Sequence, residues 1–170
     1  MDQSTETANA AVQSEVLQKE GKYLTFALAN EEYGLEILKV REIIGYMEIT
    51  NVPQTPMFVK GVINQRGQVI PVVVLRLKFG MEEAEVTEQT CIFVVGIDQD
   101  GRTFQTGIVV AHVSEVLDIA EGQIEDAPQI GSTVDTDFIS GMGKIGDTVK
   151  ILLDIDKVLG REDLSSIGSM

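Results

Sequence analysis

Residues 61–75 read GVINQRGQVIPVVVL, an apolar stretch in which a single charge, Arg66, stands beside a glycine. The apolar residues on either side of "QRGQ" predict two β-strands folded about this tetrapeptide. Pro71 falls in the second strand and predicts an edge or a bulge there, because proline has no N–H to donate to a neighbouring strand. Arg66 is therefore predicted at the tip of a hairpin, where it is either a solvated turn residue or a residue presented to a partner.

The hairpin pattern occurs a second time, as one part of an internal duplication. "GLEILKVREII" at 34–44 aligns without gaps with "GIVVAHVSEVL" at 107–117. The identical positions are Gly34 and Gly107, Val40 and Val113, and Glu42 and Glu115. "YLTFAL" precedes the first copy as "CIFVVGI" precedes the second, and "KGVINQRGQVIPVVVL" follows the first as "SGMGKIGDTVKILLDI" follows the second, with a one-residue gap. Four elements recur in order, so we interpret the chain as two related β-subdomains, with chance similarity in a valine-rich chain as the alternative.

The other elements are predicted to be mainly short strands. "KYLTFALA" and "YGLEI" alternate between apolar and polar residues, which predicts a strand pair, and "DQDG" joins "CIFVVGI" to "RTFQTGIVVA" in another hairpin. The apolar residues of "ILKVREII", at 37–44, have helix-like spacing and predict a helix of about two turns. A terminal helix is predicted to begin near Asp156.

The predicted fold class is mainly β, with two similar small β-barrel subdomains packed together, short helices and a C-terminal helix. We expect a flexible tail over residues 1–20, and the end of the terminal helix with a tail over 161–170. Between them, residues 21–160 are expected to form one domain of two intertwined subdomains, with related halves at about 22–80 and 90–155. Because neither half, at ~70 residues, buries enough surface by itself, we expect the subdomains to share an apolar interface.

Composition restricts the class of partner. The chain has 13 basic and 27 acidic residues, and its net charge of -14 repels the phosphates of nucleic acid and of anionic lipid. Its amino terminus lacks the basic flank and apolar core of a signal peptide, and no apolar stretch approaches the ~20 residues of a membrane span. We therefore expect a cytoplasmic protein that binds other proteins, with no nucleic-acid partner and no direct insertion into a membrane.

Motifs for catalysis or for cofactor binding are weak. His112 is the only histidine, and Cys91, within the apolar run "CIFVV", is the only cysteine. The sequence therefore does not supply the several convergent side chains that a zinc site or a catalytic dyad needs. "GMGKIG" at 141–146 has the glycine spacing of a dinucleotide loop, but a strand rather than a helix is predicted to follow it. "DQDG" at 98–101 lacks the glutamate of a calcium loop. We expect no enzyme, no cofactor and no metal, although the many carboxylates leave an unrecognised hydrolase open.

The stretch from "FALANEEYGLEI" through "FISGMGKIGDTVKILLDIDKVL" resembles the CheW-like coupling domain of bacterial chemotaxis. The resemblance covers roughly residues 21–160, and its most specific part is "KGVINQRGQVIPVVVLR", which is similar to the family pattern G-x-x-N-L-R-G-x-x-x-P-x-x-D-L-R. It implies a free-standing, non-catalytic adaptor of two β-barrel subdomains. In the family, such a scaffold couples transmembrane chemoreceptors to the histidine kinase CheA, and is recruited from the cytoplasm to membrane-associated receptor arrays.

The resemblance also implies binding residues. The family's receptor-binding groove lies between the subdomains and takes the helical hairpin tip of a receptor. The positions that match it are Val40, Glu42, Gly61, Arg66, Cys91 and Val116. Contact with the regulatory domain of the kinase is expected on the second subdomain, around Ile130 and Gly141. Core packing is the alternative for the valines and the cysteine, and backbone conformation is the alternative for the glycines.

Three positions depart from the family pattern. Gln65 replaces the usual leucine before Arg66, while Val74 and Ala111 each replace an acidic residue. With those two acids gone, Glu42 is predicted to be the carboxylate that pairs with Arg66. Two other functions stay open: a coupler of a non-flagellar chemosensory pathway, and a β-barrel module that binds a small ligand in a closed apolar pocket.

Overall fold

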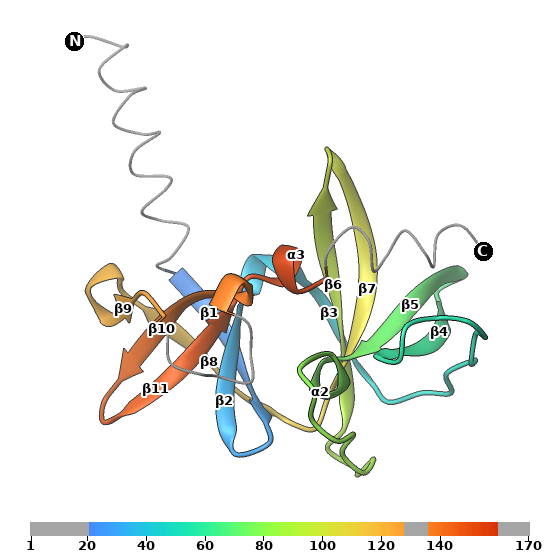
Figure 1. Cartoon of the computed structure of the whole chain (residues 1–170), viewed down its shortest axis with the longest axis horizontal. Coiled ribbons are helices and arrows are strands. Elements are labelled where there is room, and N and C mark those ends of the chain that lie inside the picture. The colour runs from blue at the N-terminus through green and yellow to red at the C-terminus, as the bar shows by residue number, and fades with distance from the viewer. Residues whose placement is uncertain (1–20, 128–135, 160–170) are drawn as a thin grey trace, which may run out of the picture.

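The structure is a computed structural model that describes residues 21–127 and 136–159, and it contains two β-sheets (Figure 1). The six-stranded sheet consists, in spatial order, of β8 (Val113–Ile119), β1 (Gly21–Leu28), β2 (Glu31–Glu36), β11 (Thr148–Leu153), β10 (Ile139–Ile145) and β9 (Ile124–Glu125). The five-stranded sheet consists of β3 (Val40–Gly45), β6 (Cys91–Gln99), β7 (Arg102–Val110), β5 (Gln68–Val74) and β4 (Val59–Gln65). The mainly β prediction is confirmed.

The helical elements are short. They are α2 (Leu75–Lys78), α3 (Ile155–Val158) and the three-residue 3-10 helices η1 (Ile37–Lys39), η2 (Glu121–Gln123) and η3 (Thr136–Phe138). The predicted terminal helix begins at Ile155, where the Asp154 side chain accepts a hydrogen bond from the backbone of Lys157 and so caps α3. The tails expected over 1–20 and 161–170 lie outside the described residues.

Each sheet contains strands from both halves of the sequence. β1 and β2 join β8, β10 and β11 from the second half, while β6 and β7 join β3, β4 and β5 from the first, so the chain changes sheets at η1 and again at Ala111–His112. In each sheet a parallel pair holds the exchanged strands together. Leu152 lies opposite Gly34 in one pair, and Val72 lies opposite Gly107 in the other. The two glycines that are identical in the sequence copies therefore occupy equivalent places.

The β4–β5 and β10–β11 hairpins share one register. Each has a β-bulge near its start, between Val59 and Gly61 in one and between Ile139 and Gly141 in the other. The turn then follows at the same distance, with Arg66 five residues after Gly61 and Gly146 five residues after Gly141. The hairpins thus align without a gap, and the predicted one-residue gap is wrong. Gly146 is the counterpart of Arg66.

Three apolar clusters form the core. The largest contains residues of both sheets, and within it the ring of Phe26 on β1 meets the ring of Phe93 on β6 edge to face, with 5.5 Å between centroids. A smaller cluster lies within each sheet. In the five-stranded sheet its buried members are Ile63, Ile70, Val72, Ile92 and Val94, and in the six-stranded sheet they are Tyr23, Ile119 and Leu152. The largest cluster is therefore the surface along which the sheets pack.

The helix predicted over 37–44 is wrong. Only Ile37–Lys39 forms a helical turn, and Val40–Gly45 is the strand β3, on which half-buried and exposed side chains alternate. The apolar spacing fits both periods over so short a segment, and β-branched valine and isoleucine favour the strand. Pro71 lies between β4 and β7 in the sheet order, but the ladder to β7 begins only at Val72, so the missing N–H of the proline leaves no gap in it.

Candidate functional site

A cluster of three polar side chains links the two outer strands of the five-stranded sheet. β3 and β4 stand at opposite ends of the strand order and are not paired with each other. The Glu42 carboxylate on β3 accepts a hydrogen bond at Oε2 from Gln65 Nε2, at 3.0 Å, and another at Oε1 from Arg66 Nη2, at 2.7 Å. We call Glu42, Gln65 and Arg66 the clasp. The predicted pair of Glu42 and Arg66 is present.

Local backbone geometry places both ends of the clasp. Arg66 and Gly67 have φ angles of 55° and 82°, the left-handed pair that a two-residue type I′ turn requires, and this turn carries Arg66 out at the hairpin tip. On β3 the register shifts between Val40 and Glu42, and a bulge of this kind re-aims the side chains beside it. The bulge of β3 and the turn after β4 face each other across the gap between the two outer strands, so the Glu42 carboxylate and the Arg66 guanidinium meet.

The clasp presents a cation on an acidic protein. The Arg66 side chain is 79% exposed and Glu42 is 29% exposed, so the pair is screened by water and contributes only ~0.2–1 kcal/mol to stability. Among the described residues, only Nη2 of the guanidinium has a partner, so most of its five N–H donors remain for another molecule. The geometry therefore favours recognition of an acceptor over stabilisation of the fold.

The other expected receptor-binding residues are not gathered around Arg66. Val40 is half-buried and packs against the largest core cluster, and Cys91 belongs to that cluster. Burial raises the pKa of the Cys91 thiol. Val116 is 51% exposed, but it stands on β8 in the other sheet. Of the six positions, Glu42 and Arg66 form an ion pair with each other.

The two glycines assigned to different partners occupy equivalent positions. Gly61 lies at the bulge of β4 with a φ of 155°, and a Cβ there would stand 2.0 Å from the carbonyl oxygen of Thr50. Gly141 lies at the bulge of β10, and a Cβ there would stand 2.6 Å from Cγ2 of Ile124. Close packing accounts for both glycines. Ile130 lies outside the described residues.

Sequence reasoning missed residues whose role depends on three-dimensional contacts. Gln65 appeared only as a departure from a family pattern, yet it holds one oxygen of Glu42. Ile43, next to Glu42, is 46% exposed, and Leu38 on η1 is 88% exposed. An apolar residue in a sequence carries no signal that distinguishes exposure from burial, so these two surface positions could not be found from pattern alone.

Val74 and Ala111, which replace two acids of the family pattern, do not lie near Arg66. Val74 and Ala111 line one small cavity of about 20 Å³ together with Arg76. Val74 is at the far end of β5 from the hairpin tip, roughly 25 Å from Arg66 at ~3.3 Å per residue. The expectation that these replacements remove partners of Arg66 is therefore wrong, and the cation near them is Arg76, whose Nε donates to the carbonyl oxygen of Glu82.

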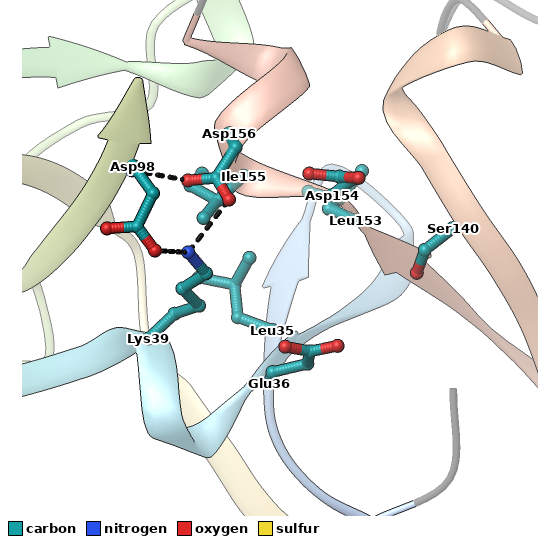
Figure 2. Close-up of a pocket in the computed structure, with 9 residues that line it drawn as sticks. All are labelled: Leu35, Glu36, Lys39, Asp98, Ser140, Leu153, Asp154, Ile155 and Asp156. Atoms are coloured by element: carbon teal, nitrogen blue, oxygen red, sulfur yellow. Dashed lines mark hydrogen bonds and ion pairs between the residues drawn. The ribbon is translucent and has the colours of Figure 1, made fainter. Parts of the chain in front are cut away.

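A cleft of about 310 Å³ lies where η1, the first crossover of the chain from one sheet to the other, meets α3 (Figure 2). Its lining residues are Leu35, Glu36, Lys39, Asp98, Ser140, Leu153, Asp154, Ile155 and Asp156. Lys39 Nζ donates to Asp98 Oδ2 and to Asp156 Oδ2, each at 2.8 Å, and the backbone N–H of Asp98 donates to Asp156 Oδ1 at 2.9 Å. The network ties η1, β6 and α3 together. Four carboxylates line this cleft, so it is not the closed apolar pocket that a small-ligand module requires.

Burial, charges and hydrogen bonds around this cleft shift the pKa of Glu36, Lys39 and Asp98. Burial lowers the pKa of Lys39, but hydrogen bonds to Asp156 and Asp98 outweigh it, and the net pKa is raised. Hydrogen bonds from Lys39 and Thr103 lower the pKa of Asp98. Burial raises the pKa of Glu36, Lys39 opposes that rise, and Asp154 and Asp156 add to it. The folded environment therefore disfavours the charged form of Glu36.

Comparison with known proteins decides the family. The sequence profile described as "CheW-like domain" matches residues 22–163. The chain belongs to the CheW-like family. Among the described residues, no helix has both the length and the apolar character needed to cross a membrane.

Relatives of the CheW-like family cover nearly the same span. A protein named chemotaxis protein CheW from Klebsiella aerogenes is 40% identical over 149 residues, covering 88% of this chain and 87% of its own. One of the same name from Bacillus subtilis is 31% identical over 146 residues, covering 85% and 90%. The crystal structure of the scaffolding protein TtCheW from Thermoanaerobacter tengcongensis matches with a TM-score of 0.75 and 35% identity, covering 85% of this chain and 90% of that one.

Proposed function

We propose that this chain is a non-catalytic adaptor that couples transmembrane chemoreceptors to the histidine kinase CheA. Membership of the CheW-like family supports the proposal, as do relatives named as chemotaxis proteins and a structural neighbour described as a scaffolding protein. The adaptor acts in the cytoplasm and is recruited to membrane-associated receptor arrays. Each sheet, curled around its own small apolar cluster, serves as one barrel-like subdomain.

The clasp is the observation that carries receptor binding. It fixes an exposed guanidinium on a protein of net charge -14. A helical hairpin tip that offers a carboxylate to Arg66 matches this surface. Val40 and Val116 are assigned to the same receptor-binding surface. Kinase binding is assigned to the six-stranded sheet near Gly141, with Ile130 beside it in the family pattern.

Reconstitution tests the coupling function. The kinase and a soluble receptor fragment from the same organism are mixed with and without this protein, and autophosphorylation of the kinase is followed with labelled ATP. We expect kinase activity to respond to the receptor only when the adaptor is added. A kinase that responds equally without it, or that ignores the receptor with folded adaptor present, would refute the proposal.

A further inference from the structure

The duplication supplies an internal comparison for the acidic residue beside Val116. Glu42 and Ile43 on β3 are the counterparts of Glu115 and Val116 on β8, 73 positions later in each case, since 115 − 42 and 116 − 43 are both 73. The registers agree, because Ile43 lies opposite Phe93 and Val116 lies opposite Leu24 at matching points of β6 and β1. The aliphatic residue is exposed in both copies, at 46% and 51%. Both sheets therefore carry, at the same place on an outer strand, an acid on one face and an exposed aliphatic residue on the other.

The backbone of Glu115 is held in place by hydrogen bonds to a buried threonine. Thr25 on β1 is fully buried, and its Oγ1 donates to the carbonyl oxygen of Glu115 at 2.8 Å and accepts from its N–H at 3.1 Å. This hydroxyl fills the irregularity in the ladder between β1 and β8. With its main chain fixed in this way, Glu115 presents an exposed side chain at a defined position.

The second copy lacks the donors that the first copy provides. Ile145 stands where Gln65 stands, and Gly146 stands where Arg66 stands, so the β10–β11 hairpin has no side chain to close a clasp. Over the part of the chain that the structure describes, the Glu115 carboxylate has no partner. Its neighbour Asp118 differs, because it already pairs with Lys22 at 3.0 Å.

We propose that Glu115 forms a docking point that receives an arginine from the receptor, as Glu42 receives Arg66 within the chain. This inference rests on the proposed coupling function and adds the chemistry of one contact. The acidic protein attracts a basic side chain. Arginine fits because its planar guanidinium matches the two oxygens of a carboxylate.

A binding titration tests the docking point. The full chain and its Glu115→Gln variant are titrated with a soluble receptor hairpin fragment by calorimetry at several salt concentrations. We expect the variant to bind roughly tenfold more weakly and to show a smaller dependence of affinity on salt, because a charge pair is lost. Asp118→Asn is the matched control on the same strand, and its receptor affinity should stay within about twofold of the parent, since Lys22 already neutralises that acid.

A second variant supplies the missing cation within the chain. Gly146 has a φ of 60°, at which any side chain is strained, but a Cβ there meets no atom within 4 Å, so the Tm of Gly146→Arg is measured beside its affinity to show that the variant folds. We expect this arginine to occupy Glu115 and to lower receptor affinity several-fold. In the Glu115→Gln background the same substitution should produce no comparable loss.

The outcomes separate this inference from the function on which it rests. Unchanged receptor affinity in Glu115→Gln, with Arg66→Ala weakened, overturns the docking point and leaves the coupling function standing. A Glu115→Gln variant that weakens only kinase binding also overturns it, because the arginine then comes from another protein. Failure of the folded parent protein to bind any receptor fragment overturns both.

Discussion

Arg66 occupies a left-handed backbone position that glycine would fill without strain. A non-glycine residue there costs about 1 kcal/mol, and the exposed pair with Glu42 contributes ~0.2–1 kcal/mol, so the two effects roughly cancel. The other hairpin uses Gly146 at this point. Stability therefore does not explain the arginine, and the proposed role in receptor binding supplies a reason for it.

Replacement of Arg66 by alanine tests this balance, because alanine has similar left-handed strain and removes only the guanidinium. We expect the Tm of Arg66→Ala to stay within about 3 °C of the parent, because the lost pair is worth at most ~1 kcal/mol. Receptor affinity should fall at least roughly tenfold. Calorimetric unfolding and a binding titration give the two values.

Arg102→Ala is the control for that comparison, since Arg102 is another exposed arginine at a hairpin, at the start of β7. It should leave both Tm and receptor affinity unchanged. If Arg66→Ala bound the receptor as tightly as this control, the assignment of Arg66 to the receptor surface would be wrong.

Two fully buried threonines should respond in opposite directions to the same substitution. Thr106 has a hydroxyl without a hydrogen-bond partner among the described residues, whereas the Thr25 hydroxyl makes two hydrogen bonds to Glu115. Thr106→Val should raise the free energy of unfolding by about 1 kcal/mol, and Thr25→Val should lower it by about 1–2 kcal/mol. Urea denaturation measures both. A loss of stability in Thr106→Val would mean that its hydroxyl is satisfied.

At the scale of elements, the hairpins were predictable and the crossovers were not. "QRGQ" and "DQDG" carry local turn chemistry, and the structure places turns at Arg66–Gly67 and Asp100–Gly101. The segment over 37–44 misled the prediction because its apolar spacing suits a helix and a strand alike. The clasp was predictable in part: the family resemblance, with two family acids missing, pointed to Glu42 as the partner of Arg66, while the contact of Gln65 depends on a distance that no pattern contains.

The crossover network predicts a dependence of stability on pH. The pKa of Glu36 is raised in the folded state, so the folded protein binds a proton more tightly than the unfolded chain does. Stability therefore falls as pH rises from the unfolded value near 4.5 through the folded pKa, and the loss persists at neutral pH. Glu36→Gln should remove this loss and raise Tm by about 2 °C at pH 7.

The gain in Glu36→Gln should shrink below about pH 4, where Glu36 is protonated in both states. Thermal unfolding across this range, compared with Glu125→Gln on the exposed edge strand β9, gives the measurement. A gain that is equally large at pH 3 would show that the carboxylate charge is not its cause.

At the scale of the whole molecule, the similarity between the two halves of the sequence did not predict which strands are exchanged between the sheets. Sequence comparison identified two related halves, but the pairing of β11 with β2 and of β5 with β7 joins residues far apart in the chain. Such pairings depend on which sheet a strand enters after a crossover, and similarity between the halves is the same for either choice.

The exchange predicts that neither half folds by itself. Residues 81–87 contain no helix or strand, so the chain can be divided there into fragments 1–84 and 85–170. Each fragment should have the narrow amide dispersion of an unfolded chain in NMR spectra, because its strands lack their partners. An equimolar mixture should regain dispersed resonances as a 1:1 complex. A fragment 1–84 that is folded without the other would contradict the observed sheet composition.

Strand exchange between two similar units is the arrangement of a domain-swapped dimer, and here it is formed within one chain. Covalent linkage replaces dependence on protein concentration with a millimolar effective concentration of one unit for the other. It also allows the two units to differ in sequence. A dimer of identical subunits carries a feature twice or lacks it, whereas a fused chain can keep an arginine on one hairpin and a glycine on the other. The fusion thereby gives the adaptor two unlike ends, as a link between two different proteins requires.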